Sequence, residues 1–280
     1  MIIETIKLFM ESKNNIFQIV GNTFLHLSGG NKGFSVHGKQ SRYINWSTNP
    51  CDVVFYVDNE AIKGLSNTSD QKKYAWLLES RGIVPGLLEH ILSNTQAYLD
   101  TYEMIFTHDQ TLLSIDSKFK WVPGQGFWIK NPMVYQKHKL VSMISSSKSM
   151  LEGHRQRLAF VEKFKDHVDL YGRGFNEIDN KEQGLCDYMF SVAIENDQYP
   201  TYFTEKILDC FATGTIPVYL GAPDIGGHFN LDAILTVDQF DLVDKTYYYD
   251  NMDAIIDNLE RAKKMEVLED FIYENYLLGS

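Results

Sequence analysis

The stretch YMFSVAIENDQYPTYFTEKILDCFATGTIPVYLGAP, from Tyr188 to Pro223, decides the fold of this chain. Its apolar run 190–194 predicts a strand, and the amphipathic run 204–212 predicts a helix that stops at Gly214. A second apolar run, 216–220, predicts another strand, which ends at Gly221. Strand, helix and strand in this order form part of a parallel sheet. Ligands bind beyond the carboxyl ends of such strands, so the polar residues there are candidates for a binding site.

The same alternation extends to both sides of this stretch. Upstream, apolar runs predict strands at 52–57, 74–78, 103–106 and 119–122, and Pro85-Gly86 opens a helix at 87–98. After a polar linker at 131–139 the pattern restarts, with strands at 140–144, 168–171 and 233–237 and helices at 153–164, 253–264 and 267–276. Strands that alternate with helices predict an α/β fold of two Rossmann-like, doubly wound domains facing across a cleft. We expect the domains at 1–135 and 136–265, with 266–280 as a helix that packs back across them.

The first fifty residues give a weaker pattern. Residues 5–10 predict a strand, and 16–27 have the apolar spacing of a helix that Gly29-Gly30 would end. The segment 31–50 is polar and contains glycine, which is typical of a loop.

Composition excludes several classes of protein. The 280 residues carry a net charge of −11 and no basic stripe, which argues against a nucleic-acid-binding surface. Three widely spaced cysteines without a CxxC motif predict neither a disulfide framework nor a zinc site, and no Asp/His cluster has metal-binding spacing. The first residues lack a signal-peptide pattern, and no apolar run has the length of a membrane span. We therefore expect a cytoplasmic protein without a transmembrane segment, and peripheral membrane association stays open.

Cationic residues gather where the strands of the second half should end: Arg155, Arg157, Arg173 and Lys206. A basic residue in the first turn of a helix opposes the helix dipole, and a bound anion would resolve this conflict. These residues suit a diphosphate, and the alternative is a solvated surface with an ion pair to Glu205. There is no P-loop, and Gly172-Arg173-Gly174 lacks the third glycine of a dinucleotide site, which disfavours hydride transfer.

One carboxylate of the first half is a candidate general base. Glu79 directly follows the apolar strand 74–78, and an apolar flank would raise its pKa toward the range useful for a base. A helix cap or an ion pair with Arg81 is the alternative. His108 and Asp109 close the next strand, where they bind substrate or have a packed or capping role.

Several of these strings together resemble the motifs of the α1,3-fucosyltransferases, glycosyltransferase family 10. The likeness is carried by IEN at 194–196, YFTEK at 202–206, IPVYLG at 216–221, VDLYGR at 168–173 and HRQR at 154–157. In the first half, LES at 78–80 and FTHD at 106–109 are similar to two further motifs, and Arg81 stands where the family has proline. The likeness is strong from about residue 140 to 240 and thin before that.

The resemblance implies a GT-B architecture and an inverting transfer that requires no metal or other cofactor. GDP-fucose, or a related GDP-sugar, would be the donor in the second domain, and a glycan would be the acceptor. Glu79 would deprotonate the acceptor hydroxyl, and Arg155 and Lys206 would face the diphosphate. The whole donor-binding set would comprise Arg155, Arg157, Arg173, Asn196, Tyr202, Thr204, Glu205 and Lys206. Two alternatives remain at this stage: another nucleotide sugar, or a non-catalytic module that binds a nucleotide or a glycan.

Overall fold

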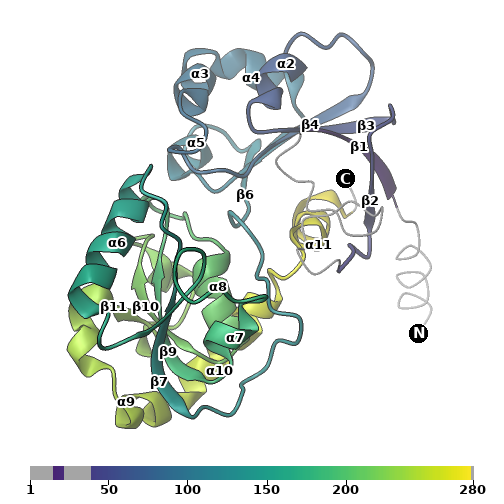
Figure 1. Cartoon of the computed structure of the whole chain (residues 1–280). Coiled ribbons are helices and arrows are strands. Elements are labelled where there is room, and N and C mark those ends of the chain that lie inside the picture. Colours follow the sequence, from purple (N-terminus) through teal and green to yellow (C-terminus); the bar gives the residue numbers. More distant parts are fainter. Residues whose placement is uncertain (1–14, 22–38, 279–280) are drawn as a thin grey trace, which may run out of the picture. The chain divides into compact units, whose positions relative to one another are not determined.

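The computed structural model describes residues 15–21 and 39–278, and it divides into two α/β units (Figure 1). The first unit contains the chain up to Val122 together with the segment from Val267 onward, and the second runs from Pro123 to Glu266. Each unit is built on one sheet in which all neighbouring strands are parallel. The predicted α/β class is therefore confirmed.

The first unit contains a six-stranded sheet in the order β2-β1-β3-β4-β5-β6. Most of its helices connect consecutive strands, and the segment after the second unit returns to it. The strands are β1 (Asn15–Val20), β2 (Ile44–Ser47), β3 (Val53–Val57), β4 (Lys72–Leu77), β5 (Met104–Thr107) and β6 (Phe119–Trp121). The helices are α2 (Glu60–Gly64), α3 (Leu87–Ser93), α4 (Thr95–Thr101), α5 (Gln110–Leu113) and α11 (Leu268–Ile272), the last continued by a π-helical turn, Tyr273–Leu277.

Apolar side chains on both faces of this sheet form two separate cores. Successive residues of a strand point to opposite faces, so Phe55 and Val57 join one core and Val54 and Tyr56 the other. The core with Phe55 is closed by Leu268 and Ile272 of α11, among others, and the other core contains residues of α3 and α4. The expected carboxyl-terminal helix thus packs within the first unit.

The early part of the chain differs from the sequence prediction. The predicted helix at 16–27 is wrong where the structure describes it, because Asn15–Val20 is a strand between β2 and β3. Strand β2 lies inside the segment predicted as a loop. Pairing partners distant in the sequence overrode the local spacing here. The predicted strand at 5–10 lies outside the described residues.

The second unit contains a five-stranded sheet in the order β11-β10-β9-β7-β8. The strands are β7 (Lys139–Ile144), β8 (Asp169–Tyr171), β9 (Tyr188–Ile194), β10 (Ile216–Leu220) and β11 (Leu235–Thr236). The α-helices are α6 (Glu152–Phe164), α7 (Glu182–Leu185), α8 (Glu205–Ala212), α9 (Lys245–Asp250) and α10 (Met252–Lys263), with short 3-10 helices at Ile225–Gly227, Leu231–Ala233 and Val237–Leu242.

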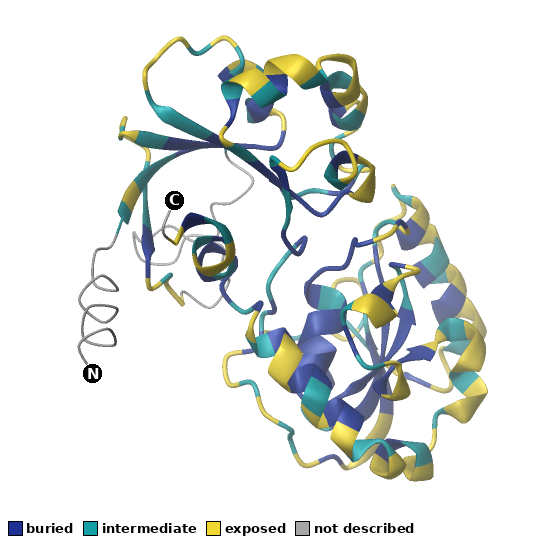
Figure 2. Ribbon diagram, turned by 180° about the vertical axis from the view of Figure 1, so that it is seen from behind, coloured by how far each residue is buried: buried dark blue, intermediate teal, exposed yellow. Residues whose placement is uncertain are grey.

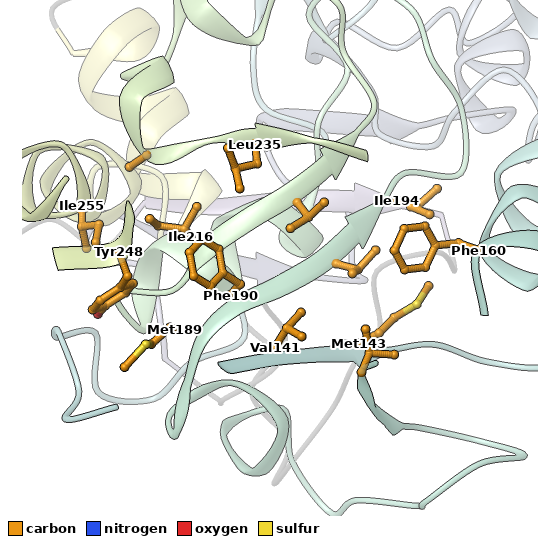
Figure 3. Close-up of a cluster of buried hydrophobic side chains, with 14 of the residues drawn as sticks. Val141, Met143, Phe160, Met189, Phe190, Ile194, Ile216, Leu235, Tyr248 and Ile255 are labelled. Carbon is orange, nitrogen blue, oxygen red and sulfur yellow. The ribbon is translucent and has the colours of Figure 1, made fainter. Parts of the chain in front are cut away.

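Figure 3 shows a core of this unit, in which Phe190 and Ile216 of neighbouring strands pack with Phe160 of α6 and Tyr248 of α9. In each unit the central strands are mostly buried, and most exposed residues lie on helices and loops (Figure 2). The sheets are therefore rigid platforms, and their strand ends can hold side chains in fixed positions.

Two predicted boundaries need correction. The linker was expected at 131–139, yet the division falls at Pro123, because Trp128, Met133 and Tyr135 donate backbone hydrogen bonds to Asp209, Ala212 and Thr213 of the second unit. The predicted helix at 87–98 is two helices, since the backbone of Asn94 is not helical (φ −128°, ψ 26°).

Candidate functional site

The strand order of the second unit reverses between β7 and β9, because β8 lies on one side of this pair and β10 and β11 on the other. Helix α6 follows β7 and helix α8 follows β9. In doubly wound folds, ligands bind in the crevice beyond the strand ends at such a switch point. The helix starts also present backbone N–H groups and the positive end of the helix dipole. This position is the natural site for an anionic ligand.

Two glycines let the main chain approach closely at this switch point. Gly153, in the first turn of α6, donates its N–H to the carbonyl of Asn196 at 3.3 Å, and a Cβ on Gly153 would lie 1.9 Å from the Glu195 carbonyl oxygen. Gly172 has φ +109°, and a Cβ there would lie 1.9 Å from the Ser145 carbonyl oxygen. Only glycine fits at either position. The start of α6 therefore lies directly against the end of β9.

The carboxylate of Glu195 organises the start of α8. Glu195 follows β9 and has no exposed surface. Its Oε1 accepts the N–H of Thr204 at 2.9 Å, and its Oε2 accepts the Thr204 hydroxyl at 2.6 Å. Thr204 is also the N-cap of α8, since its Oγ1 accepts the N–H of Lys206. Glu195 thus fixes the direction in which α8 leaves the crevice.

The ammonium group of Lys206 is held inside this arrangement. Its Nζ lies 3.3 Å from Glu195 Oε2 and 3.4 Å from Glu205 Oε1, and it donates to Thr204 Oγ1 at 2.9 Å. Burial raises the pKa of Glu205, but Lys206 and Lys181 outweigh burial and lower that pKa to about 2. Glu205 is therefore a carboxylate at neutral pH, and the ion pair that the sequence offered as the alternative role of Glu205 is present.

The structure adds residues that sequence reasoning missed. Lys181 places its Nζ 2.5 Å from Asp209 Oδ2 and 3.4 Å from Glu205 Oε1, and the same ammonium lies 4.1 Å from the ring centre of Trp128. Asp209 also accepts the backbone N–H of Trp128. Asp209 is an ionisable residue within the apolar run of α8, one turn after Glu205, and this signal could have identified it.

The two arginines of α6 have different surroundings. Arg157 is buried, donates from Nη2 to Asn196 Oδ1 at 2.6 Å and from Nε to the Gly153 carbonyl at 3.1 Å. The structure thus brings Arg157 and Asn196 together. The side chain of Arg155 is 57% exposed and pairs with Glu152 of its own helix at 2.5 Å. In this conformation Arg155 reaches the crevice only if it leaves Glu152.

Two further predicted residues lie nearby. Tyr202 is buried, and its ring stacks on Tyr199 with centroids 4.8 Å apart. Arg173 is exposed on the turn after β8. Its backbone carbonyl accepts the N–H of Ser147 at 3.2 Å. Tyr202 therefore supports the loop before α8, whereas the structure does not place Arg173 in the group around Glu195.

The charges around α8 nearly cancel. Lys181, Lys206 and Arg157 are the cations, and Glu195, Glu205 and Asp209 are the carboxylates. An anion that binds here would rely on N–H groups at the helix starts and on cations that exchange partners.

A groove of about 990 Å³ at the ends of β10 and β11 has a different character, because Asp224, Asp232 and Asp238 line it together with no lysine or arginine. That groove does not suit a phosphate group.

In the first unit, Glu79 lies just beyond β4 and is partly buried. Its neighbour Arg81 forms a two-point ion pair with Asp109, through Nε at 2.6 Å and Nη2 at 2.7 Å. Asp109 also caps α5 by accepting the N–H of Thr111, so its predicted capping role is confirmed. His108 is buried against the backbone. The Arg81 guanidinium therefore ties the segment after β4 to Asp109.

Within residues 15–21 and 39–278, no cluster of three or more His, Cys, Asp and Glu side chains is arranged to hold a metal ion. In the same part of the chain, none of the helices combines the length and the apolar character needed to cross a bilayer.

Comparison with solved structures identifies the fold class. A crystal structure of an α1,3-fucosyltransferase matches 88% of this chain and 80% of its own, with a TM-score of 0.51 and 16% sequence identity. Together with the two parallel-sheet units, this likeness defines a protein of the GT-B fold class.

Sequence comparison finds a likeness to one family in part of the chain. Residues 134–259 match the model of glycosyltransferase family 10 (fucosyltransferase), C-terminal part. The chain is 35% identical over 106 residues to α-(1,3)-fucosyltransferase FucT of Helicobacter pylori, and 28% identical over 134 residues to a putative fucosyltransferase-like protein of Arabidopsis thaliana. These alignments cover 37% and 46% of this chain but only 20% and 26% of the relatives. The predicted likeness to the α1,3-fucosyltransferase family is therefore confirmed, and it lies in the second unit.

Proposed function

We propose that this protein is an inverting glycosyltransferase that transfers fucose from GDP-fucose to a hydroxyl group of a glycan. The observation that carries the proposal is the start of α8, where buried Glu195 fixes Thr204 and Lys206 at the carboxyl edge of a parallel sheet. This arrangement lies within the residues that match the fucosyltransferase family model. Cytoplasmic location and independence of metal belong to the same proposal.

The proposed reaction is a single displacement. The acceptor oxygen attacks the anomeric carbon of fucose while Glu79 takes the hydroxyl proton, and the bond from that carbon to the β-phosphate oxygen breaks. GDP leaves with the bonding electrons, so negative charge grows on its diphosphate. Lys206 and the N–H groups at the start of α8 would stabilise this charge, because they are in position before it develops, and Arg155 would join them after leaving Glu152. Glu205 and Tyr202 would hold the rest of the donor.

Binding measurements test which nucleotide the donor site accepts. By calorimetry we expect GDP and GDP-fucose to bind and UDP and CMP to bind at least about tenfold more weakly, because the resemblance to the α1,3-fucosyltransferases implies a GDP-sugar donor. Tight binding of UDP in place of GDP would favour the alternative of another nucleotide sugar.

Turnover measurements test whether the protein is an enzyme and whether Glu79 is its base. Release of GDP from GDP-fucose should depend on a glycan acceptor, persist in EDTA, and fall by about 10²–10⁴-fold in Glu79→Gln with the affinity for GDP unchanged. Glu103→Gln is the matched control, because Glu103 is exposed before β5, at the opposite end of the same sheet. Binding of GDP without turnover on any acceptor tested would instead favour a non-catalytic module.

A further inference from the structure

The backbone of Asp58 adopts an unusual conformation at the end of β3. Its φ is +48°, in the left-handed region, and the residue is 3% exposed. Aspartate tolerates this region better than most residues do, but the conformation still has to be stabilised by its surroundings. Backbone strain of this kind is concentrated at functional sites. The Asp58 side chain is therefore a candidate for a functional role.

The Asp58 carboxylate extends the pairing between β3 and β4 beyond the end of β3. The last paired residues are Val57 and Trp76, and the Asp58 N–H donates to the Trp76 carbonyl at 3.0 Å. The chain then turns into α2, so β3 has no further carbonyl to offer. Instead, Asp58 Oδ1 accepts the N–H of Leu78 at 2.8 Å and that of Glu79 at 3.1 Å. One side-chain oxygen therefore accepts hydrogen bonds from two successive backbone amides, those of Leu78 and Glu79.

A second side chain holds the other side of this segment. His108, after the neighbouring strand β5, lies with Nε2 3.0 Å from the Leu78 carbonyl. Burial lowers the pKa of His108 to about 4, so the ring is neutral near pH 7 and donates this hydrogen bond from an Nε2–H. The N–H and the carbonyl of Leu78 and the N–H of Glu79 are thus all bonded to buried side chains. This leaves little freedom in the backbone that carries Glu79.

We infer that Asp58 is a positioning residue for the general base Glu79: its Oδ1 fixes the Leu78 and Glu79 amides and thereby the place of the Glu79 carboxylate. The inference rests on the proposed function, and it adds a residue to the reaction's machinery. A general base has to reach the acceptor proton within hydrogen-bonding distance, so a small backbone displacement at Glu79 reduces the rate of the chemical step. Asp58 acts through Glu79 and needs no contact with substrate.

Two variants separate positioning from backbone strain. Asp58→Asn keeps an Oδ1 acceptor and tolerates φ +48°, whereas Asp58→Gly adopts this φ freely but has no acceptor. We expect kcat to fall by about 10–100-fold in Asp58→Gly, with KM for GDP-fucose within about twofold of wild type, and to stay within about threefold in Asp58→Asn. The Leu78 and Glu79 amides should exchange hydrogen faster in the glycine variant only.

The outcomes distinguish failure of the proposed function from failure of the positioning role of Asp58. If the wild-type protein shows no turnover on any acceptor, the proposed function fails; if it turns over and Asp58→Gly matches it in kcat, the positioning role is overturned. Unchanged affinity for GDP shows that the second unit of each variant is intact. Should Asp58→Gly lose its near-ultraviolet circular dichroism, Asp58→Asn decides alone, because a tenfold loss of kcat in that folded variant contradicts the inference.

Discussion

The guanidinium of Arg81 and the carboxylate of Asp109 meet in a two-point ion pair, with Nε and Nη2 at 2.6 and 2.7 Å from the two carboxylate oxygens. This pair joins the segment after β4 to the start of α5, since Asp109 is also the N-cap of that helix. Arg81 stands where the resembled motif has proline. The ion pair therefore restrains by contact a segment that proline would restrain by its ring.

This pair should contribute measurably to stability. In a double-mutant cycle with Arg81→Ala and Asp109→Asn, we expect a coupling of about 1–2 kcal/mol in the free energy of unfolding, because the geometry is bidentate and Asp109 is buried. The exposed pair of Arg261 and Asp257 is the control, with a coupling of at most about 0.5 kcal/mol. Equal coupling in both pairs by urea denaturation would contradict this account.

Buried His108 should make the protein less stable in mild acid. Its folded pKa is about 4, below its usual value of 6.5, so between these values the unfolded chain binds the proton more readily than the folded protein does. The free energy of unfolding should therefore fall as the pH drops from 6.5 to 4, by up to about 3 kcal/mol from this residue. In His108→Gln that part of the slope should vanish, and an identical slope in the two proteins would refute it.

Gly153 should tolerate no side chain. In Gly153→Ala the new methyl group would lie 1.9 Å from the Glu195 carbonyl oxygen, so the start of α6 has to move away from β9. We expect a loss of about 1–3 kcal/mol in the free energy of unfolding and weaker binding of GDP.

Gly227 supplies the matched control, since a Cβ there meets nothing within 4 Å. Gly227→Ala should leave stability and binding near wild type. Equal effects at the two positions, by thermal unfolding and calorimetry, would argue against close contact between α6 and β9.

Alanine variants of the two arginines of α6 should differ in their effects on GDP binding and on thermal stability. Arg155→Ala should raise the Kd for GDP by about tenfold or more at an unchanged thermal midpoint, because the exposed guanidinium pairs only locally with Glu152 before donor binds. Arg157→Ala should also lower the midpoint, since it removes a buried hydrogen bond to the Gly153 carbonyl and a partly buried one to Asn196.

Lys165→Ala is the control for both arginine variants, as Lys165 is exposed at the other end of α6 and pairs with Glu162. An Arg155→Ala protein that binds GDP like the Lys165→Ala protein would remove Arg155 from the donor site.

The pattern of the sequence was sufficient for most strands and the longer helices of the second unit, but not for the short helices α7 and α9. Predicted strands at 140–144, 168–171 and 216–220 and the predicted helix at 153–164 all occur within a residue or two of their predicted bounds. Helix α8 begins where the predicted amphipathic run begins, with Thr204 as its N-cap. These features depend on periodicity and capping, which neighbouring residues encode.

The early strand β1 was not predictable in the same way. Its spacing resembles that of a helix, and it becomes a strand because β2 and β3 pair with it on both sides. The division at Pro123 likewise depends on hydrogen bonds from residues 128–135 to the region around α8, about 80 residues later.

Sequence alone determined the alternation of strands and helices and the family likeness, because side chains a few residues apart report the local backbone. Tertiary structure decided that Arg157 rather than Arg155 is buried against Asn196, that Lys181 joins Glu205 and Asp209, and that Asp58 holds the backbone of Glu79. Each of these contacts links residues 20 or more positions apart. Only the folded sheets bring such residues within bonding distance.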